Sequence, residues 1–137
     1  GLRKQADEFL HERISNMKKA LLESATVVHG VTVVTCYGPR IAEVVKGTAF
    51  ALKAEHPNDL MFVAATQEMG KPMLTVMLSD NLVKDGLNAS AVVREAAKLI
   101  KGGGGGQPHF AQAGGKNVDG LPAALDKMLD LLNVKQQ

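Results

Sequence analysis

Gly102-Gly-Gly-Gly-Gly106-Gln-Pro-His-Phe-Ala-Gln-Ala-Gly-Gly115-Lys-Asn117 is the stretch on which the interpretation of this chain depends. Its five initial glycines are typical of a flexible linker when they occur alone. Here the run stands between two helical patterns and is followed at once by Phe110 and a second glycine pair, which a linker does not need. Glycine permits positive φ angles, and successive N–H groups in such a turn bind anions. The stretch therefore predicts a phosphate-binding loop flanked by Lys101 and Lys116.

The spacing of these glycines does not fit a nucleotide-binding loop. The loop of NTPases needs Gly-x-x-x-x-Gly-Lys followed by Ser or Thr, whereas Gly115-Lys116 is followed by Asn117. The earlier glycine position of that pattern holds Phe110. The dinucleotide pattern Gly-x-Gly-x-x-Gly fails because Gln107 holds its last place. Binding of ATP or a dinucleotide is therefore not supported.

Helices are expected on both sides of the glycine stretch. Residues 89–101 have helical periodicity, with Asn88 as the N-cap and Gly102 as the glycine that ends the helix. The expected buried side of this helix consists of Val92, Val93, Ala96, Ala97, Leu99 and Ile100. After a short strand over residues 110–113, Asp119 is expected to cap a last helix. The apolar face of that helix consists of Leu121, Ala124, Leu125, Met128, Leu129 and Leu132.

The first part of the chain predicts the rest of an α/β fold. Residues 2–24 show an apolar stripe at helical spacing, and residues 27–28 and 31–37 form a β-branched run ended by Gly38-Pro39. Pro39 is expected to begin a helix that reaches residue 53, and residues 56–59 form a turn. Strands over residues 60–66 and 72–78 should be antiparallel because their connection is short. The sequence predicts a mixed-sheet sandwich over residues 25–137 and an N-terminal helical arm over residues 1–24. The arm either packs on the domain or associates with a second copy.

Composition sets further limits. The chain has 137 residues, enough for one core, and only 4% of them are aromatic. An aliphatic core follows, and base stacking is disfavoured as the main way of binding nucleic acid. The 16 basic and 14 acidic residues give a net charge of +2, but residues 84–116 alone carry +3. The charge of the chain does not identify a nucleic-acid binder, and its distribution points to the glycine stretch.

No catalytic or metal-binding constellation is predicted. Cys36 lies in an apolar run, and the sequence near it offers no base, so a buried structural thiol is expected. The histidines are widely spaced and do not form a zinc pattern. Without a signal peptide or an apolar stretch of membrane-spanning length, a cytoplasmic location and no membrane contact are expected. The chain begins at Gly1 inside a helical pattern, which indicates a piece of a longer protein.

The glycine stretch resembles the C-terminal glycine motif of alanyl-tRNA synthetases, Gly-Gly-Gly-Arg-Pro-x-x-Ala-Gln-x-Gly-Gly. The resemblance covers residues 25–134, and residues 1–24 resemble the upstream helical part of that domain. Gln107 is a departure, because many members carry Arg at this position. The same fold family forms the C-terminal half of DHH-type phosphoesterases, whose glycine loop ends Gly-Gly-Gly-His-x-x-Ala-Ala-Gly. The Ala-Gln-x-Gly-Gly form of residues 111–115 favours the synthetase.

The resemblance implies a domain that performs no chemistry and grips the body of tRNA, expected to be tRNA-Ala. It would assist aminoacylation and editing by the upstream catalytic and editing domains of the same chain, with homodimer formation through residues 1–24 as a further possibility. ATP, Mg and Zn would be used by those other domains, and no cofactor is expected in this one. The expected nucleic-acid-binding residues are Lys98, Lys101, Gly102, Gly103, Gly104, Gly105, Gly106, Gln107, His109, Gln112, Gly114, Gly115 and Lys116.

Two alternatives to the tRNA-binding domain stay open. One is the nucleic-acid substrate domain of a DHH-type phosphoesterase, and the other is a dimerisation module without RNA contact. Residues upstream of Gly1 would separate the first from the synthetase: class II synthetase motifs and a His-x-x-x-His editing site would support the ligase, and an Asp-His-His motif with further aspartates would support the phosphoesterase.

Overall fold

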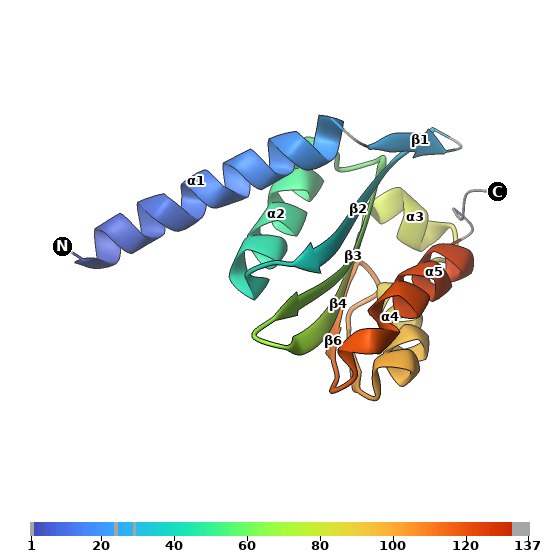
Figure 1. Cartoon of the computed structure of the whole chain (residues 1–137). Helices are drawn as coiled ribbons and strands as arrows, with labels where there is room; N and C mark the ends of the chain where they lie inside the picture. Colours follow the sequence, from blue (N-terminus) through green and yellow to red (C-terminus); the bar gives the residue numbers. More distant parts are fainter. Residues whose placement is uncertain (1, 24, 29, 133–137) are drawn as a thin grey trace.

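Six strands form one mixed sheet with helices on both faces (Figure 1). The computed structural model describes residues 2–23, 25–28 and 30–132. The strands are β1 Thr26–Val28, β2 Val31–Pro39, β3 Leu60–Glu68, β4 Lys71–Leu78, β5 Gly103–Gly106 and β6 Phe110–Gly114, in the spatial order β1-β2-β3-β4-β6-β5. Only β2 and β3 run parallel, and the other neighbours are antiparallel. The predicted mixed sheet is confirmed.

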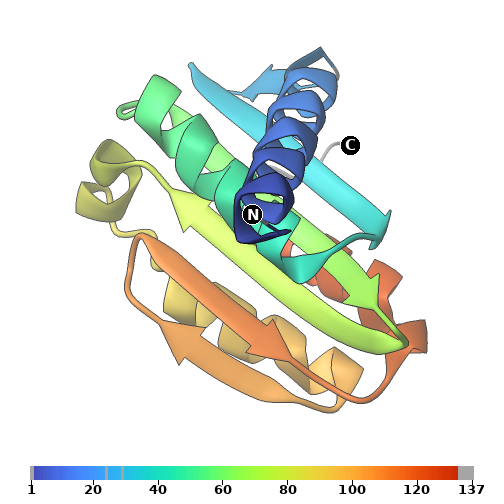
Figure 2. The same ribbon diagram turned by 90° about the vertical axis from the view of Figure 1, so that its left-hand side faces the viewer.

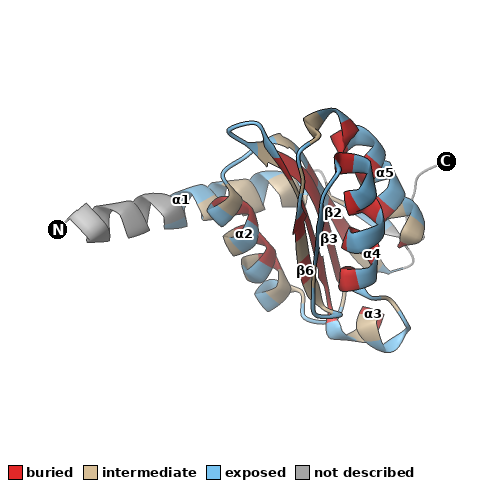
Figure 3. Cartoon of the chain, turned by 90° about the horizontal axis from the view of Figure 1, so that it is seen from below, coloured by how far each residue is buried: buried red, intermediate tan, exposed pale blue. Residues whose placement is uncertain are grey.

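The helices make the two outer layers of a sandwich. They are α1 Leu2–Glu23, α2 Ala42–Glu55, α3 Asp80–Lys84, α4 Ala89–Ala97 and α5 Leu121–Leu131, with short 3-10 turns at Lys98–Ile100 and Val118–Gly120. Helices α1 and α2 lie on one face of the sheet, and α4 and α5 lie on the other (Figures 1 and 3). No helix of the described residues is long and apolar enough to cross a membrane.

Strand β3 contributes side chains to two hydrophobic cores, one on each face of the sheet. Its residues 60–66 are all buried, because helices cover both faces of the sheet at its centre. Met61, Val63 and Ala65 face the core with α4 and α5, while Phe62 and Ala64 face the core with α2. Fully burying a side chain as large as Phe62 stabilises the fold by about 2–3 kcal/mol. The apolar run 60–66 is therefore the centre of both layers.

The N-terminal helix packs on the body of the domain through its second half. Met17, Leu21 and Leu22 contact the core beneath α2. At Gly47 of α2 an added Cβ would overlap the Cδ1 atom of Ile14 and lie 3.0 Å from its Cγ1, so the two helices approach closely there. The Lys18 ammonium also lies 3.1 Å from the Glu55 carboxylate. Packing on the body is thus observed, whereas self-association stays a prediction.

Several predicted boundaries are wrong. Residues 26–28 form a separate strand that turns back on β2 through Gly30, at φ +79°. Pro39 ends β2 instead of starting a helix. Proline has no N–H to donate to a neighbouring strand. At Pro39 this is tolerated, because β1 pairs only with residues 31–33 of β2 and no described strand lies beside Pro39 on that side of β2. Helix α2 begins at Ala42 and runs two residues beyond the expected end.

Helix ends in the second half also differ from prediction. The short helix α3 was missed, since five residues give too little periodicity to detect. The last helix has Gly120, not Asp119, at its N-cap position. Lys101, not Gly102, adopts the left-handed conformation after the 3-10 turn, with φ 54°. Leu99, expected to be buried, is 39% exposed, because the tighter 3-10 turn rotates it outward.

The cap of α4 gives a direct stability prediction. The Oδ1 atom of Asn88 accepts a hydrogen bond from the Ala91 backbone N–H at 3.1 Å, as the sequence predicts. Asn88→Ala should lower the free energy of unfolding by about 1 kcal/mol, measured from chemical denaturation. Asn88→Ser keeps a capping oxygen and should stay within a few tenths of a kcal/mol of the parent. Equal losses in both variants would show that the cap contributes nothing.

Candidate nucleic-acid interface

The glycine run is an edge strand, not a loop. Gly103–Gly106 pair antiparallel with residues 111–114 of β6, with Gly104 opposite Ala113 and Gly105 opposite Gln112. The glycines with positive φ among the described residues are Gly30, Gly38, Gly70 and Gly86, all outside this segment. The expectation of a left-handed glycine loop is wrong, because the second apolar segment, β6, gives the run a strand to pair with.

The close approach of β5 to its neighbours explains most of these glycines. A Cβ on Gly104 would overlap the carbonyl oxygen of Gln112 and lie 2.5 Å from the Ala113 Cα. Gly102 and Gly106 would meet the β6 backbone in the same way. At Gly105 a Cβ would lie 3.2 Å from the Ser90 Oγ of α4, whereas nothing lies within 4 Å at Gly103. Four of the five glycines are thus required, or nearly so, by packing.

The amides after β6 are already used inside the protein. The N–H of Gly115 donates to the Pro72 carbonyl at 3.2 Å. The N–H groups of Lys116 and Asn117 both donate to the Ile100 carbonyl, at 2.8 and 2.9 Å, and so terminate the helical segment before β5. The predicted anion nest is therefore not formed here, because the Gly115 N–H is bonded to β4 and the next two N–H groups satisfy a helix end.

One end of the β5–β6 hairpin gathers the lysines that sequence analysis selected. We call residues 98–102 and 114–117 the lysine end; these two segments hold Lys98, Lys101 and Lys116 and no acidic residue. All three side chains are exposed, and Lys98 lies 3.3 Å from Glu95. Exposed Lys71, at the start of β4, lies at the same end, since Gly115 bonds to Pro72. The lysine end is a basic surface.

The other end of the hairpin holds Gln107 and His109. Gln107 and Phe110 exchange backbone hydrogen bonds of 2.9 and 3.2 Å that close the turn. The Pro108 carbonyl accepts from the N–H of Ala89, which docks this turn on the start of α4. Gly102 and Gln107 are five residues apart in an extended segment, a span of about 17 Å. The structure therefore separates Gln107 and His109 from the lysines.

Gln112 lies on a third surface. Its Nε2 atom donates to the Thr75 Oγ1 at 3.3 Å, and beside it Phe110 packs against Phe50 in a tilted arrangement with ring centroids 4.8 Å apart. Figure 2 shows that α1 and α2 leave β6 and β5 without a helix on this face. Phe50 is 46% exposed there. Sequence analysis missed Phe50 and Thr75, because residues distant in sequence meet only across the folded sheet.

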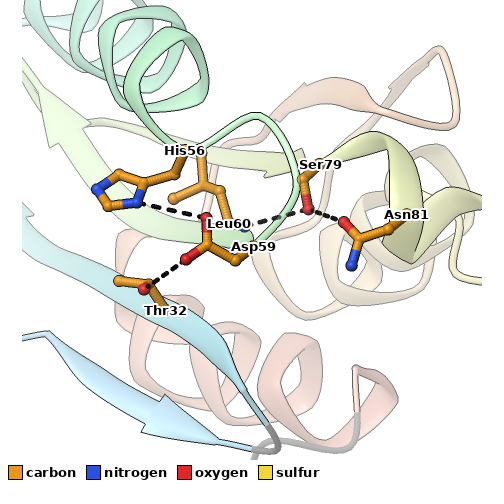
Figure 4. Close-up of polar contacts among 6 residues, drawn as sticks. All are labelled: Thr32, His56, Asp59, Leu60, Ser79 and Asn81. Carbon is orange, nitrogen blue, oxygen red and sulfur yellow. Dashed lines mark hydrogen bonds and ion pairs between the residues drawn. The ribbon is translucent and has the colours of Figure 1, made fainter.

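A cluster of serine, histidine and aspartate does not form a hydrolytic site. His56 Nδ1 lies 3.4 Å from Asp59 Oδ1, and Thr32 Oγ1 donates to Asp59 Oδ2 at 3.4 Å (Figure 4). The Ser79 hydroxyl is buried; it donates to Asn81 Oδ1 at 2.6 Å and accepts from the Leu60 N–H at 3.1 Å. It makes no bond to His56. The cluster fixes the ends of β3 and β4.

Neither a reactive thiol nor a metal cluster is found in the described part of the chain. Cys36 is 2% exposed, and burial raises the pKa of its thiol while the nearby Arg40 guanidinium acts in the opposite direction. Raised pKa values disfavour the thiolate that a nucleophile needs. No group of three or more His, Cys, Asp or Glu side chains could hold a metal ion among the described residues. Cys36 is structural, as expected.

The fold and the basic end of its sheet define a small α/β domain with a glycine edge strand, and comparison with known proteins places it in a family. Residues 30–134 match the DHHA1 domain, and the chain belongs to the DHHA1 domain family. It is 54% identical over 134 residues to an alanine–tRNA ligase from Bacteroides thetaiotaomicron and 46% identical over 130 residues to one from Porphyromonas gingivalis. These alignments cover 98% and 94% of this chain but only 15% of each ligase.

Solved structures agree with the sequence comparison. The C-Ala domain of alanyl-tRNA synthetase from Aquifex aeolicus has a TM-score of 0.67 at 28% identity, covering 79% of this chain and 96% of that chain. A DHH-domain protein described as a member of the s1p family of ribosomal proteins has a TM-score of 0.62 at 14% identity, covering 99% of this chain and 33% of that one. The second likeness shows a shared fold alone.

Proposed function

We propose that this chain is the tRNA-contacting accessory domain of an alanine–tRNA ligase and that it holds the body of tRNA-Ala for the upstream catalytic and editing domains. The observation that carries this proposal is the 54% identity to such a ligase along almost the whole chain. The likeness to a C-Ala domain of the same class of enzyme supports it. ATP, Mg and Zn would serve the rest of the ligase.

The lysine end supports contact with RNA phosphates. Lys98, Lys101 and Lys116 are exposed on two adjoining connections, and Lys71 extends the same surface. Next to them, Gly103 and Gly104 are exposed and lack side chains, so a ribose–phosphate backbone can come close to the sheet edge. Folded RNA is bound mainly through its shape and backbone, which suits such a surface.

The end of the hairpin that holds Gln107 and His109 is a weaker part of the proposed interface. Helix α3, which carries Asp80, and then Asp85 lead into the α4 start on which this turn docks. Asp80 lies 3.6 Å from Lys53. Acidic groups repel phosphates, so we place the first contacts with tRNA at the lysine end and treat Gln107, His109 and Gln112 as later contacts.

A domain that binds phosphates should lose affinity steeply as salt rises. Contact with about 3–4 phosphates gives a slope of roughly −3 in a plot of log affinity against log salt concentration. Fluorescence anisotropy with labelled tRNA-Ala transcript between 50 and 200 mM salt, roughly the range over which such contacts are lost, measures the slope. An affinity that does not change with salt would contradict the proposed contact.

The other candidate functions predict different results. A phosphoesterase substrate domain would bind nucleic acid without a preference for folded tRNA, which competition between tRNA and an unfolded oligonucleotide in the same anisotropy assay measures. A dimerisation module would form a dimer in sedimentation without affinity for tRNA. Either result would replace the proposal.

A further inference from the structure

A cavity of about 660 Å³ opens between α1 and the end of the sheet from which α2 begins. Its walls come from the second half of α1, the β2–α2 connection and the β3–β4 turn. The volume lies within the roughly 300–1,000 Å³ of pockets that hold small ligands. None of the expected nucleic-acid-binding residues lines it, so the proposed phosphate contacts leave it unexplained.

Besides aliphatic residues and the Glu68 carboxylate, three kinds of group in the lining of this cavity suit a nucleotide. Met17 and Met69 supply flexible thioether walls, and thioethers pack well against aromatic rings. Arg13 and Arg40 bring guanidinium groups, and Asn16 and Gln67 bring amides. Guanidinium groups bind phosphate, and amides pair with the edges of heterocyclic bases. A cavity with thioether walls, amides and two guanidinium groups suits a nucleotide better than it suits an aliphatic side chain of a protein partner.

Glu68 and Arg40, two of the charged groups around the cavity, make hydrogen bonds within the domain. Glu68 Oε1 accepts from the Ala42 N–H at 3.1 Å, so this carboxylate is engaged at the start of α2. Arg40 Nη1 donates to the Pro39 carbonyl at 2.7 Å, which fixes the guanidinium beside the cavity. Because the Glu68 carboxylate occupies a donor of the helix start and repels anions, a bound phosphate would rely on the arginines and lie away from Glu68.

We propose that this cavity holds one unstacked nucleotide of the bound RNA, with the base between Met17 and Met69 and the phosphate beside Arg13 and Arg40. The inference rests on the proposed tRNA contact and adds a site to it. Lys71, two residues after Met69, joins the cavity to the lysine end, so one RNA strand can reach both. Unstacked bases in loops are the usual targets of specific RNA recognition.

Met69 offers a variant that separates binding from folding. Met69 and Gly70 have φ angles of 54° and 79°, the positive pair of a two-residue hairpin turn for which Asn-Gly is the favoured sequence. The Met69 side chain is 95% exposed, so Met69→Asn removes no buried contact and should fold at least as stably as the parent. The same substitution removes one wall of the cavity. We expect affinity for nucleotide to fall about two- to tenfold, the range expected for the loss of one sulfur–aromatic contact. Val27→Asn, at a 71% exposed position on β1, is the matched control and should leave the affinity unchanged.

The methionine methyl groups report on the cavity directly. The chain has six methionines, of which Met17 and Met69 line the cavity while Met61, Met77 and Met128 are buried. In methyl NMR of the 137-residue chain, nucleoside 5′-monophosphates should shift Met17 and Met69 and leave the three buried methyl groups unmoved. In Met69→Asn, the Met17 shift should saturate only at higher nucleotide concentration.

Two results with small ligands would overturn the inference. Equal shifts with inorganic phosphate alone would show an anion site without a base, and no shift of Met17 and Met69 with any nucleotide would show no site. A titration with tRNA-Ala transcript then separates the two proposals. Binding that perturbs the lysine end but not Met17 and Met69 overturns only the cavity site. No binding of tRNA at low salt overturns the proposed function itself.

Discussion

Gly104→Ala should lower the free energy of unfolding by about 3 kcal/mol, which is roughly a 10 °C fall in Tm for a domain of this size. The added methyl group would collide with the Gln112 carbonyl and the Ala113 Cα. Both are backbone atoms, so no rotamer change relieves the contact and β5 must move away from β6. Thermal unfolding followed by circular dichroism measures the change.

Gly103→Ala is the matched control for this variant. It makes the same substitution one residue earlier in the same strand, where nothing lies within 4 Å of the added Cβ and φ is not positive. Its stability should stay within about 1 kcal/mol of the parent, because the unfolded chain also loses freedom when glycine is replaced. If the two variants unfold at the same temperature, packing against β6 does not explain the glycine at position 104.

Replacing Lys101 and Lys116 together by alanine should weaken tRNA binding about tenfold at low salt and flatten the log–log salt slope by about two units. Both side chains are exposed on the two adjoining connections of the lysine end. Their removal costs no buried contact, so the Tm should not change. Anisotropy titrations at several salt concentrations measure both quantities.

A double variant of equal charge provides the control for this result. Lys84→Ala with Lys127→Ala removes two exposed lysines that lie on α3 and α5, outside the lysine end. It should leave affinity and slope nearly unchanged. If Lys101 and Lys116 contact only phosphates, their joint replacement should weaken binding by the same factor for any tRNA. A loss confined to tRNA-Ala would contradict a backbone-only role for Lys101 and Lys116.

The regular elements of this fold were predictable because their patterns are local. The apolar run 60–66, the Asn88 cap and the short 67–71 connection each specify their structure through neighbouring residues. The mixed sheet and the two helical layers follow from the order of these elements. Short elements were missed: α3 has five residues and β1 has three, too few for a period to show.

The glycine segment was misassigned for a different reason. Strand propensity depends on β-branched and aromatic side chains, so a run of glycines does not predict a strand. Its conformation is set by the close backbone of β6, which a local pattern does not show. The cavity was missed for a similar reason, since Met17, Arg40 and Met69 meet only after α1 folds onto the sheet. The lysines expected to bind nucleic acid are exposed neighbours in the fold, and their contact with RNA stays a prediction.

Mapping the backbone amides that respond to tRNA shows whether the lysine end contacts RNA. In 1H–15N NMR of the 137-residue chain with tRNA-Ala transcript, we expect the largest shifts at the lysine end, in residues 98–102 and 114–117, together with Lys71. Smaller or no shifts are expected in α3 and in β1. A perturbed surface that leaves out the lysine end would contradict the account.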